Sequence, residues 1–173
     1  MCAHSSSAND IVSKISQKLY PFIVDQFREL DEYNEINPPS NKTSLLNELV
    51  QTIKHEFESL RNYETKLVFP SVQELFDTKN NPNFKSTVNV QELQQLTQKK
   101  EEVIRGLLKD LQREAASLHL IKGHPVYLII NVFTDFFFIE KEKWHRMLNS
   151  WNSGCACFAK ANCKNKAKAT HSK

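Results

Sequence analysis

Glycine is scarce in this sequence. The chain has three glycines among 173 residues, whereas an ordinary usage of about 7 % would give roughly twelve. Parallel α/β folds, nucleotide-binding loops and Greek-key sandwiches need glycine where the backbone turns tightly or approaches a ligand. The scarcity therefore excludes these classes and favours long helices joined by few connections.

Cysteine is absent from the middle of the chain. The four cysteines lie near the two ends, at Cys2, Cys155, Cys157 and Cys163, so they are not placed to staple a folded body. The first ten residues also lack the basic segment and the apolar run of a secretory signal peptide. We therefore expect a reduced protein inside the cell, in the cytoplasm or the nucleus and not secreted.

Long hydrophobic runs are missing as well. The most apolar stretch, Val126–Ile139, has 14 residues and contains Asn131 and Asp135, whereas a helix needs about 20 apolar residues to span a bilayer. We expect no transmembrane span here. The stretch instead predicts a helix buried inside a folded protein.

The formal net charge of +3 is unevenly distributed. Residues 154–173 hold five lysines and no acidic residue, which leaves 18 basic and 20 acidic residues in the rest of the chain. A nucleic-acid-binding domain usually carries positive charge on its folded face as well. Because the predicted folded body is slightly acidic, we expect no nucleic-acid partner.

Apolar residues recur every three or four positions in four segments, which is the spacing of one helix face. The third segment has an apolar stripe made of Leu93, Leu96, Val103, Leu107, Leu111 and Leu118, widened by Ile104 and Leu108. Helix-breaking residues, such as the Pro38-Pro39 pair, separate the segments. The pattern predicts helices at about 10–34, 43–76, 89–118 and 125–151.

Individual residues indicate where these helices are irregular. Pro21 lies inside the first segment and, lacking a backbone donor, should kink or split the helix near Leu19. Pro70 interrupts the second segment in the same way. Asn89, followed by Glu92 three residues later, is typical of the capping box that begins a helix.

Four segments of this length, each about 38 Å long as a helix, predict an all-α protein. We expect a four-helix bundle of long antiparallel helices as a single domain over residues 10–152. Residues 1–9 are expected to be a flexible N-terminus, and residues 153–173 a short, disordered, basic tail.

Helical bundles often hold metal ions, so the histidines and carboxylates are candidate ligands. A ferritin-like centre needs the pattern Glu-x-x-His on two helices, and this chain has one copy, Glu142 to His145. His119 and His124 are five residues apart and straddle a predicted helix break, which is not the one-turn spacing that aligns two ligands. These four residues remain candidate metal ligands, although no complete site can be assembled from them.

A fifth candidate ligand comes from a short resemblance. The segment Tyr63–Val72 resembles the part of hemerythrin-like domains in which a histidine, and a glutamate four residues later, precede an apolar-Phe-Pro turn. Glu64 stands at the position of that glutamate, and Leu60 stands where the histidine would be. The resemblance covers ten residues and implies, as an alternative function, a hemerythrin-like or other metal- or small-ligand-binding bundle.

Aromatic residues gather late in the chain, and not all of them fit one core-facing stripe. Exposed aromatic residues on a polar background are typical of protein interfaces. No Ser/His/Asp or Cys/His arrangement and no glycine-rich phosphate loop is readable, so we lean away from an enzyme and expect no cofactor. We interpret the chain as a non-enzymatic helical interaction module, an adaptor or complex subunit, that contacts a protein partner through Tyr127, Phe138, Trp144 and Trp151.

The cysteine-bearing tail allows three interpretations. Cys155, Cys157 and Cys163 could bind a metal ion together with His171, although they lack the paired spacing of common zinc motifs. The same cysteines could be acylated, with the neighbouring lysines supporting peripheral contact with an anionic membrane. The default interpretation is a disordered basic tail with reduced thiols.

Overall fold

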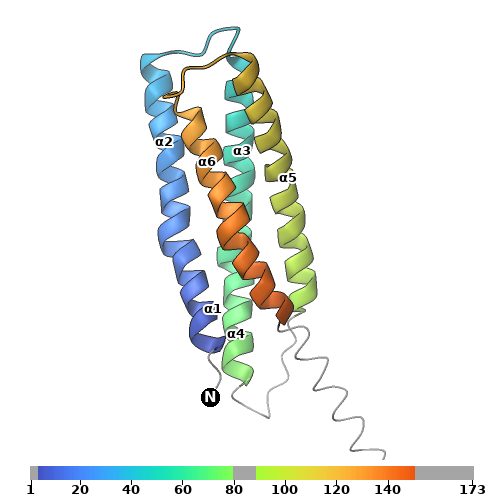
Figure 1. Ribbon diagram of the computed structural model, residues 1–173. Helices are drawn as coiled ribbons and strands as arrows, with labels where there is room; N and C mark the ends of the chain where they lie inside the picture. Colours follow the sequence, from blue (N-terminus) through green and yellow to red (C-terminus); the bar gives the residue numbers. More distant parts are fainter. Residues whose placement is uncertain (1–3, 80–88, 151–173) are drawn as a thin grey trace, which may run out of the picture.

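The computed structural model describes residues 4–79 and 89–150 (Figure 1). Four long helical segments run up and down side by side, each antiparallel to the next in the chain, and the described residues contain no strand. The predicted four-helix bundle is therefore confirmed. It follows from four amphipathic segments that can bury their apolar faces only against one another.

The first segment consists of α1 (His4–Ser13), a π-helical stretch η1 (Lys14–Leu19), and α2 (Tyr20–Ile36). It begins before the expected start, so residues 4–9, which were predicted to be flexible, are helical. The irregularity expected at Pro21 is confirmed, since η1 ends directly before Tyr20 and Pro21. A π-helical turn widens the helix where proline cannot donate to the preceding turn.

The second segment repeats this arrangement. It consists of α3 (Ser44–Tyr63), a π-helical stretch η2 (Glu64–Val68), and α4 (Phe69–Lys79). Pro70 lies two residues after the end of η2, as Pro21 lies two residues after the end of η1, and the helical direction continues through both positions. The sequence indicated both irregular positions, and the structure shows that the chain absorbs each of them without a loop.

The other two segments are α5 and a fourth helix that includes a third π-helical stretch. α5 (Val90–Ser117) begins at the predicted cap, where the Asn89 side chain accepts a hydrogen bond of 3.2 Å from the backbone N–H of Glu92. The fourth helix consists of α6 (Val126–Asp135) and η3 (Phe136–Lys141) and continues as α-helix over residues 142–150.

Aromatic side chains from three of the segments fill the middle of the core. Phe133 of α6 lies at the centre, with ring centroids 5.4 Å from Phe57, 5.8 Å from Phe27 and 5.9 Å from Phe137. The pairs with Phe57 and Phe27 meet edge to face, which is a favourable arrangement for aromatic quadrupoles. The aromatic richness of the fourth helix therefore serves packing to a large extent.

The third helix buries only part of the apolar stripe that the sequence predicted, together with polar residues outside that stripe. Leu96 and Val103 of the predicted stripe are exposed, whereas the polar residues Thr97 and Glu101 are buried. The prediction is wrong at Leu96 and Val103, because part of the buried face is polar and apolar periodicity cannot find polar positions. The stripe members Ile104, Leu108 and Leu111 are buried as predicted. The buried residues of α5 are Gln94, Thr97, Glu101, Ile104, Leu108, Leu111 and Ala115.

Two further expectations concern a membrane span and the C-terminal tail. No described helix is long and apolar enough to cross a membrane. The basic tail, with Cys155, Cys157 and Cys163, lies outside the described residues, so its three interpretations stay predictions.

Candidate functional site

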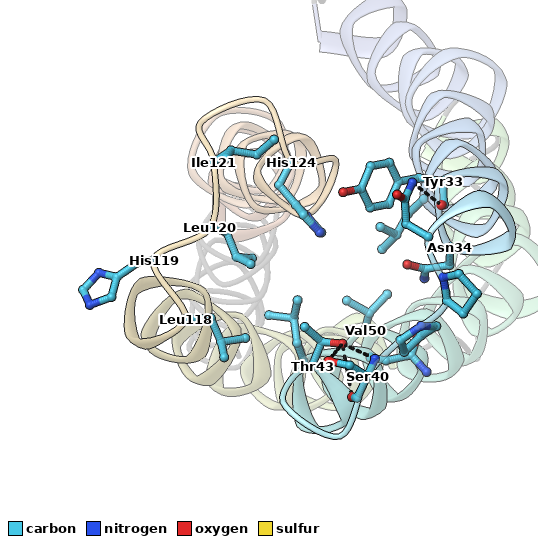
Figure 2. A pocket seen from close by; sticks show the side chains of 16 residues that line it. Tyr33, Asn34, Ser40, Thr43, Val50, Leu118, His119, Leu120, Ile121 and His124 are labelled. Carbon is cyan, nitrogen blue, oxygen red and sulfur yellow. Dashed lines mark hydrogen bonds between the residues drawn. The ribbon is translucent and has the colours of Figure 1, made fainter.

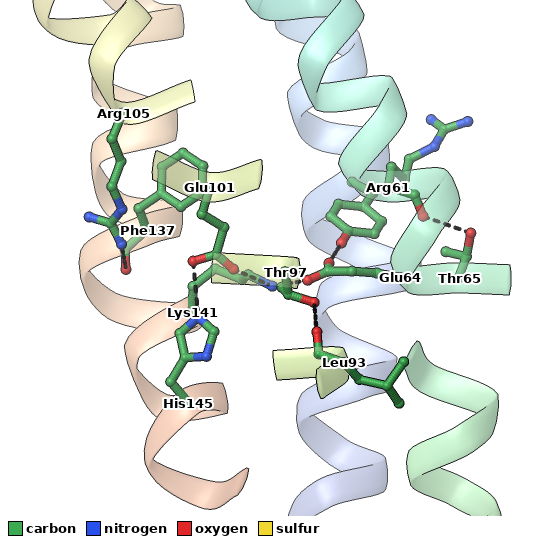
Figure 3. A network of polar contacts seen from close by, with 11 residues as sticks. Arg61, Glu64, Thr65, Leu93, Thr97, Glu101, Arg105, Phe137, Lys141 and His145 are labelled. Carbon is green, nitrogen blue, oxygen red and sulfur yellow. Dashed lines mark hydrogen bonds and ion pairs between the residues drawn. The ribbon is translucent and has the colours of Figure 1, made fainter. Parts of the chain in front are cut away.

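A charged cluster is buried inside the bundle, and Lys141 is at its centre. Lys141 is 0 % exposed at the end of η3, and its ammonium group contacts Glu64 Oε1 of η2, which is also 0 % exposed. The same ammonium group lies 2.9 Å from Glu101 Oε1 of α5 (Figure 3). One cation thus bridges two carboxylates that come from two other helices.

Two further side chains complete this cluster. The Tyr20 hydroxyl of α2 donates a hydrogen bond to Glu64 Oε2. The His145 ring, one turn after Lys141, places Nε2 2.9 Å from Glu101 Oε2. Each carboxylate is therefore held by Lys141 on one oxygen and by a second side chain on the other. We call Tyr20, Glu64, Glu101, Lys141 and His145 the central cluster; they come from all four helical segments.

The π-helical stretches position three members of the central cluster. Tyr20 directly follows η1, Glu64 is the first residue of η2, and Lys141 is the last residue of η3. Single π-helical turns inside α-helices are frequent at functional sites, because the wider turn reorients the side chains around it. Three helices of this bundle thus have their irregular turn at the central cluster.

Burial and charge act in opposite directions on the ionisable groups of the central cluster. Burial lowers the pKa of Lys141, but the neighbouring Glu64 and Glu101 outweigh it and hold the pKa above its usual value. Burial raises the pKa of Glu101, but Lys141 and His145 outweigh it and hold that pKa below its usual range. For Glu64 burial prevails over the attraction of Lys141, so its pKa is raised. Lys141 and Glu101 are therefore the firmly charged pair.

The histidine end of the central cluster contains polar atoms without a partner. His145 Nε2 donates to Glu101, because an ionised carboxylate can only accept. His145 Nδ1 is buried and has no hydrogen-bond partner among the described residues, and the same holds for Nε1 of the adjacent Trp144. A buried polar group without a partner costs about 1–3 kcal/mol, so this end of the cluster is its least satisfied part.

The structure brings together only some of the predicted metal ligands. Glu64 and His145 both join the central cluster, where Glu64 contacts Lys141 and His145 contacts Glu101. Glu142 lies at the surface, 3.5 Å from Arg146. His119 and His124 lie in the connection between α5 and α6. Among the described residues, no group of three or more His, Cys, Asp or Glu side chains is arranged to hold a metal ion.

The predicted interaction residues also separate. Phe138 is 69 % exposed, whereas Tyr127 is half-buried and packs against the core. Trp144 is 0 % exposed, with its ring edge-on to Phe69 at 5.4 Å, so it lies inside the bundle and offers no surface. Trp151 lies outside the described residues. Of the four, Phe138 is the one that the structure presents to solvent.

Sequence reasoning missed Tyr20, Glu101 and Lys141. A signal for Lys141 was present, because it lies four residues after Phe137 and three before Trp144, in register with buried positions. Lysine is almost never fully buried without a partner, so a lysine at a core position predicts a buried carboxylate elsewhere. The sequence does not say which of the 20 acidic residues that partner is.

The pKa of Glu101 leads to a prediction for the pH dependence of stability. Its pKa is lowered in the fold, so its stabilising contribution is present above its unfolded pKa of about 4.3 and is lost as the pH falls below about 4. We expect Glu101→Gln to lower the free energy of unfolding at pH 7, and the difference from wild type to shrink below pH 4. Urea unfolding between pH 7 and pH 3 measures both.

Two neighbouring carboxyls serve as references for this measurement. Glu64 has a raised pKa and therefore the opposite sign, because protonation of Glu64 favours the folded state. Glu140 lies nearer the surface, 2.7 Å from Lys14, so Glu140→Gln should have a smaller effect at pH 7. If wild type and Glu101→Gln differed in free energy of unfolding by the same amount from pH 7 to pH 3, the assigned charge state would be contradicted.

Comparison with known protein families, with curated proteins and with solved structures found no match for this chain.

Proposed function

We propose that this protein is a helical interaction module, an adaptor or complex subunit inside the cell, that binds a partner protein on the surface between α5 and the fourth helix. The observation that supports the proposal is Phe138, a large aromatic side chain that is 69 % exposed at the edge of a groove. A solvent-facing phenylalanine beside a hollow is typical of an interface anchor.

Buried apolar side chains, most of them aromatic, form the base of the groove. Its volume is about 260 Å³, and Leu108, Phe133 and Phe137 form its base. Because the base belongs to the packed core, an inserted side chain would meet a preformed apolar surface. We call this hollow the α5–α6 groove; it is lined by Arg105, Leu108, Lys109, Gln112, Phe133, Thr134, Phe137 and Phe138.

The rim of the α5–α6 groove is positively charged. Arg105 lies over the rings of Phe137 and Phe138, at 4.7 Å and 5.2 Å, and donates a hydrogen bond of 3.3 Å to the Phe137 carbonyl. Lys109 is one helical turn away on α5 and is exposed. Neither cation is paired with a carboxylate of another described residue, and no acidic residue lines the groove.

These features define the partner that the groove fits. An apolar floor accepts a hydrophobic side chain, and two uncompensated cations favour carboxylates beside it. The proposed occupant is a segment of a partner protein that presents a leucine or phenylalanine flanked by glutamate or aspartate. The exposed ring of Phe138 would then be covered by the partner.

The central cluster bears on the metal-binding alternative. A metal ion between Glu64 and Glu101 would have to displace the Lys141 ammonium group, which already contacts both carboxyl groups. The cluster therefore supports an interaction module with an internally paired core more than a metal-binding bundle. Stoichiometric iron or zinc in the purified protein would contradict this proposal.

We expect Phe138→Ser and the double variant R105E/K109E to weaken partner binding strongly without affecting the fold. The test uses a helical peptide with one leucine flanked by glutamates, titrated onto ¹⁵N-labelled protein. Its binding should shift the amide signals of residues 105–112 and 133–138. Truncating an interface anchor typically costs about 2 kcal/mol or more, which is roughly a 30-fold loss of affinity.

Phe22 supplies the matched control. It is an exposed phenylalanine on α2, 51 % exposed, and it does not line the α5–α6 groove. Phe22→Ser should bind the peptide as the wild type does, and a peptide with lysines in place of the glutamates should not bind. Equal affinities for the acidic and basic peptides, or equal losses from Phe138→Ser and Phe22→Ser, would overturn the proposal.

A further inference from the structure

A cavity of about 400 Å³ lies at the end of the bundle where two connections meet. The connection between α2 and α3 forms one side of it, and the connection between α5 and α6 forms the other (Figures 1 and 2). It shares no lining residue with the α5–α6 groove. The volume falls within the range of about 300–1,000 Å³ that is typical of small-molecule sites. We call it the end cavity.

The lining of the end cavity is uncharged. None of its sixteen lining residues is Asp, Glu, Lys or Arg, although these types make up 25 % of the chain. Leu30, Leu46 and Val50 line it, and all three are buried core residues. An apolar base without charged groups favours a neutral ligand, because an ion would lose its hydration without gaining a counter-charge.

His124 provides a directed hydrogen-bond donor. Its Nδ1 accepts a hydrogen bond of 3.2 Å from the backbone N–H of Val126 at the start of α6. Burial lowers the pKa of His124, so the ring is neutral and carries its proton on Nε2. Nε2 has no partner among the described residues. Tyr33 packs edge-on against the ring, with centroids 4.9 Å apart, and Figure 2 shows the two side chains next to each other.

Other polar groups of the end cavity are also uncommitted. The Tyr33 hydroxyl and the side-chain amides of Asn34 and Asn47 line it and make no hydrogen bond to another described residue. Ser40 and Thr43, in contrast, are occupied with each other, since the Ser40 N–H donates to Thr43 Oγ1 at 2.8 Å. A few free polar groups above an apolar base are the usual composition of a ligand site.

The wall formed by the connection after α5 is held by a strained residue. His119 has φ 48°, in the left-handed region that favours glycine, and it is the one positive-φ residue among those described. Such a conformation costs about 1–2 kcal/mol for a residue with a side chain. Figure 2 shows the His119 side chain pointing away from the cavity, so its backbone serves to direct residues 120–124 across the end of the bundle.

We propose that the end cavity binds an uncharged small molecule with a compact apolar body and a carbonyl oxygen that accepts from His124 Nε2–H. The body lies on Leu30, Leu46 and Val50, and the amides of Asn34 and Asn47 provide further hydrogen bonds. This site is separate from the protein-binding surface proposed above, so either proposal can fail without the other.

The test uses small ring compounds of similar size that are either uncharged or charged. Benzamide, acetanilide and cyclohexanone are uncharged carbonyl compounds, and benzoate, benzylamine and cyclohexylamine are their charged counterparts. Each is titrated onto the ¹⁵N-labelled full chain. We expect saturable binding of at least one uncharged probe, with amide shifts at residues 33, 34, 47 and 118–124. Its affinity should exceed that of its charged counterpart at least tenfold, or about 1.4 kcal/mol.

Two variants locate the binding in the end cavity. Asn34 lies in the last turns of α2, and Asn34→Trp places a large side chain in the end cavity. His124→Asn removes the ring that carries the Nε2 donor. Both should reduce the affinity of the best uncharged probe at least tenfold, whereas Asn62→Trp, on α3 away from the cavity, should not. Absence of saturable binding for all three uncharged probes, equal binding of the charged ones, or undiminished binding by a folded Asn34→Trp would overturn the proposal.

Discussion

Replacing Lys141 by methionine is expected to lower the free energy of unfolding by about 3–5 kcal/mol. Methionine has a similar length and no branch, so the packing changes little. The substitution removes the ammonium group that Glu64 and Glu101 share, and it leaves these two buried carboxyl groups without their common cation. Urea unfolding at pH 7, followed by the helical circular dichroism signal, measures the loss.

Two comparisons separate charge from packing. Lys143→Met changes a lysine two residues away that is half-exposed and 3.4 Å from Glu140, and it should alter stability by no more than about 0.5 kcal/mol. The triple variant K141M/E64Q/E101Q removes all three charges and should recover much of the loss, because uncharged groups tolerate burial better than unpaired ions. Wild-type stability of Lys141→Met, or a triple variant less stable than the single one, would contradict the ion-pair account.

Phe133→Ala is expected to have a comparable effect, about 3–5 kcal/mol, for a different physical reason. The ring of Phe133 is almost fully buried and contacts the rings of Phe27, Phe57 and Phe137. Its removal leaves a cavity between three helices, since the rings around it are each held by further neighbours and cannot all move inward. Chemical denaturation at pH 7 gives the difference in unfolding free energy.

Phe138→Ala is the matched control for this prediction. Phe138 is five residues later on the same helix but is 69 % exposed, so its truncation should change stability by about 0.5 kcal/mol or less. Phe133→Leu, which restores most of the volume, should be intermediate between Phe133→Ala and the wild type. If Phe138→Ala destabilised the protein as much as Phe133→Ala, the assignment of these two residues to surface and core would be wrong.

The fold was predictable because the signals that encode it are local. Three- and four-residue apolar spacing predicted the four helices, and the Asn89 cap begins α5 where the capping pattern indicated. Pro21 indicated an irregular turn because the missing donor of a proline acts within its own helix. A bundle then follows, since four amphipathic helices of similar length have few other ways to bury their apolar faces.

The central cluster was not predictable in the same way. Asp135, the carboxylate inside the most apolar stretch, is exposed and takes no part in the cluster. Glu101 lies in a polar part of α5 and is buried against Lys141. Whether an ionic group can be buried depends on which charge of another helix contacts it. Here Lys141 contacts Glu101, 40 positions earlier in the chain, and Glu64, 77 positions earlier.

The sequence by itself thus determined the helices, the Asn89 cap of α5 and the irregular turns at Pro21 and Pro70, because these depend on neighbouring residues along one chain segment. Only the tertiary structure decided which face of α5 is buried, that Trp144 lies inside while Phe138 lies outside, and that Lys141 lies between two glutamates. Side-chain charges and rings act over a few ångströms in space, and the folded arrangement of the four helices decides which of them come that close.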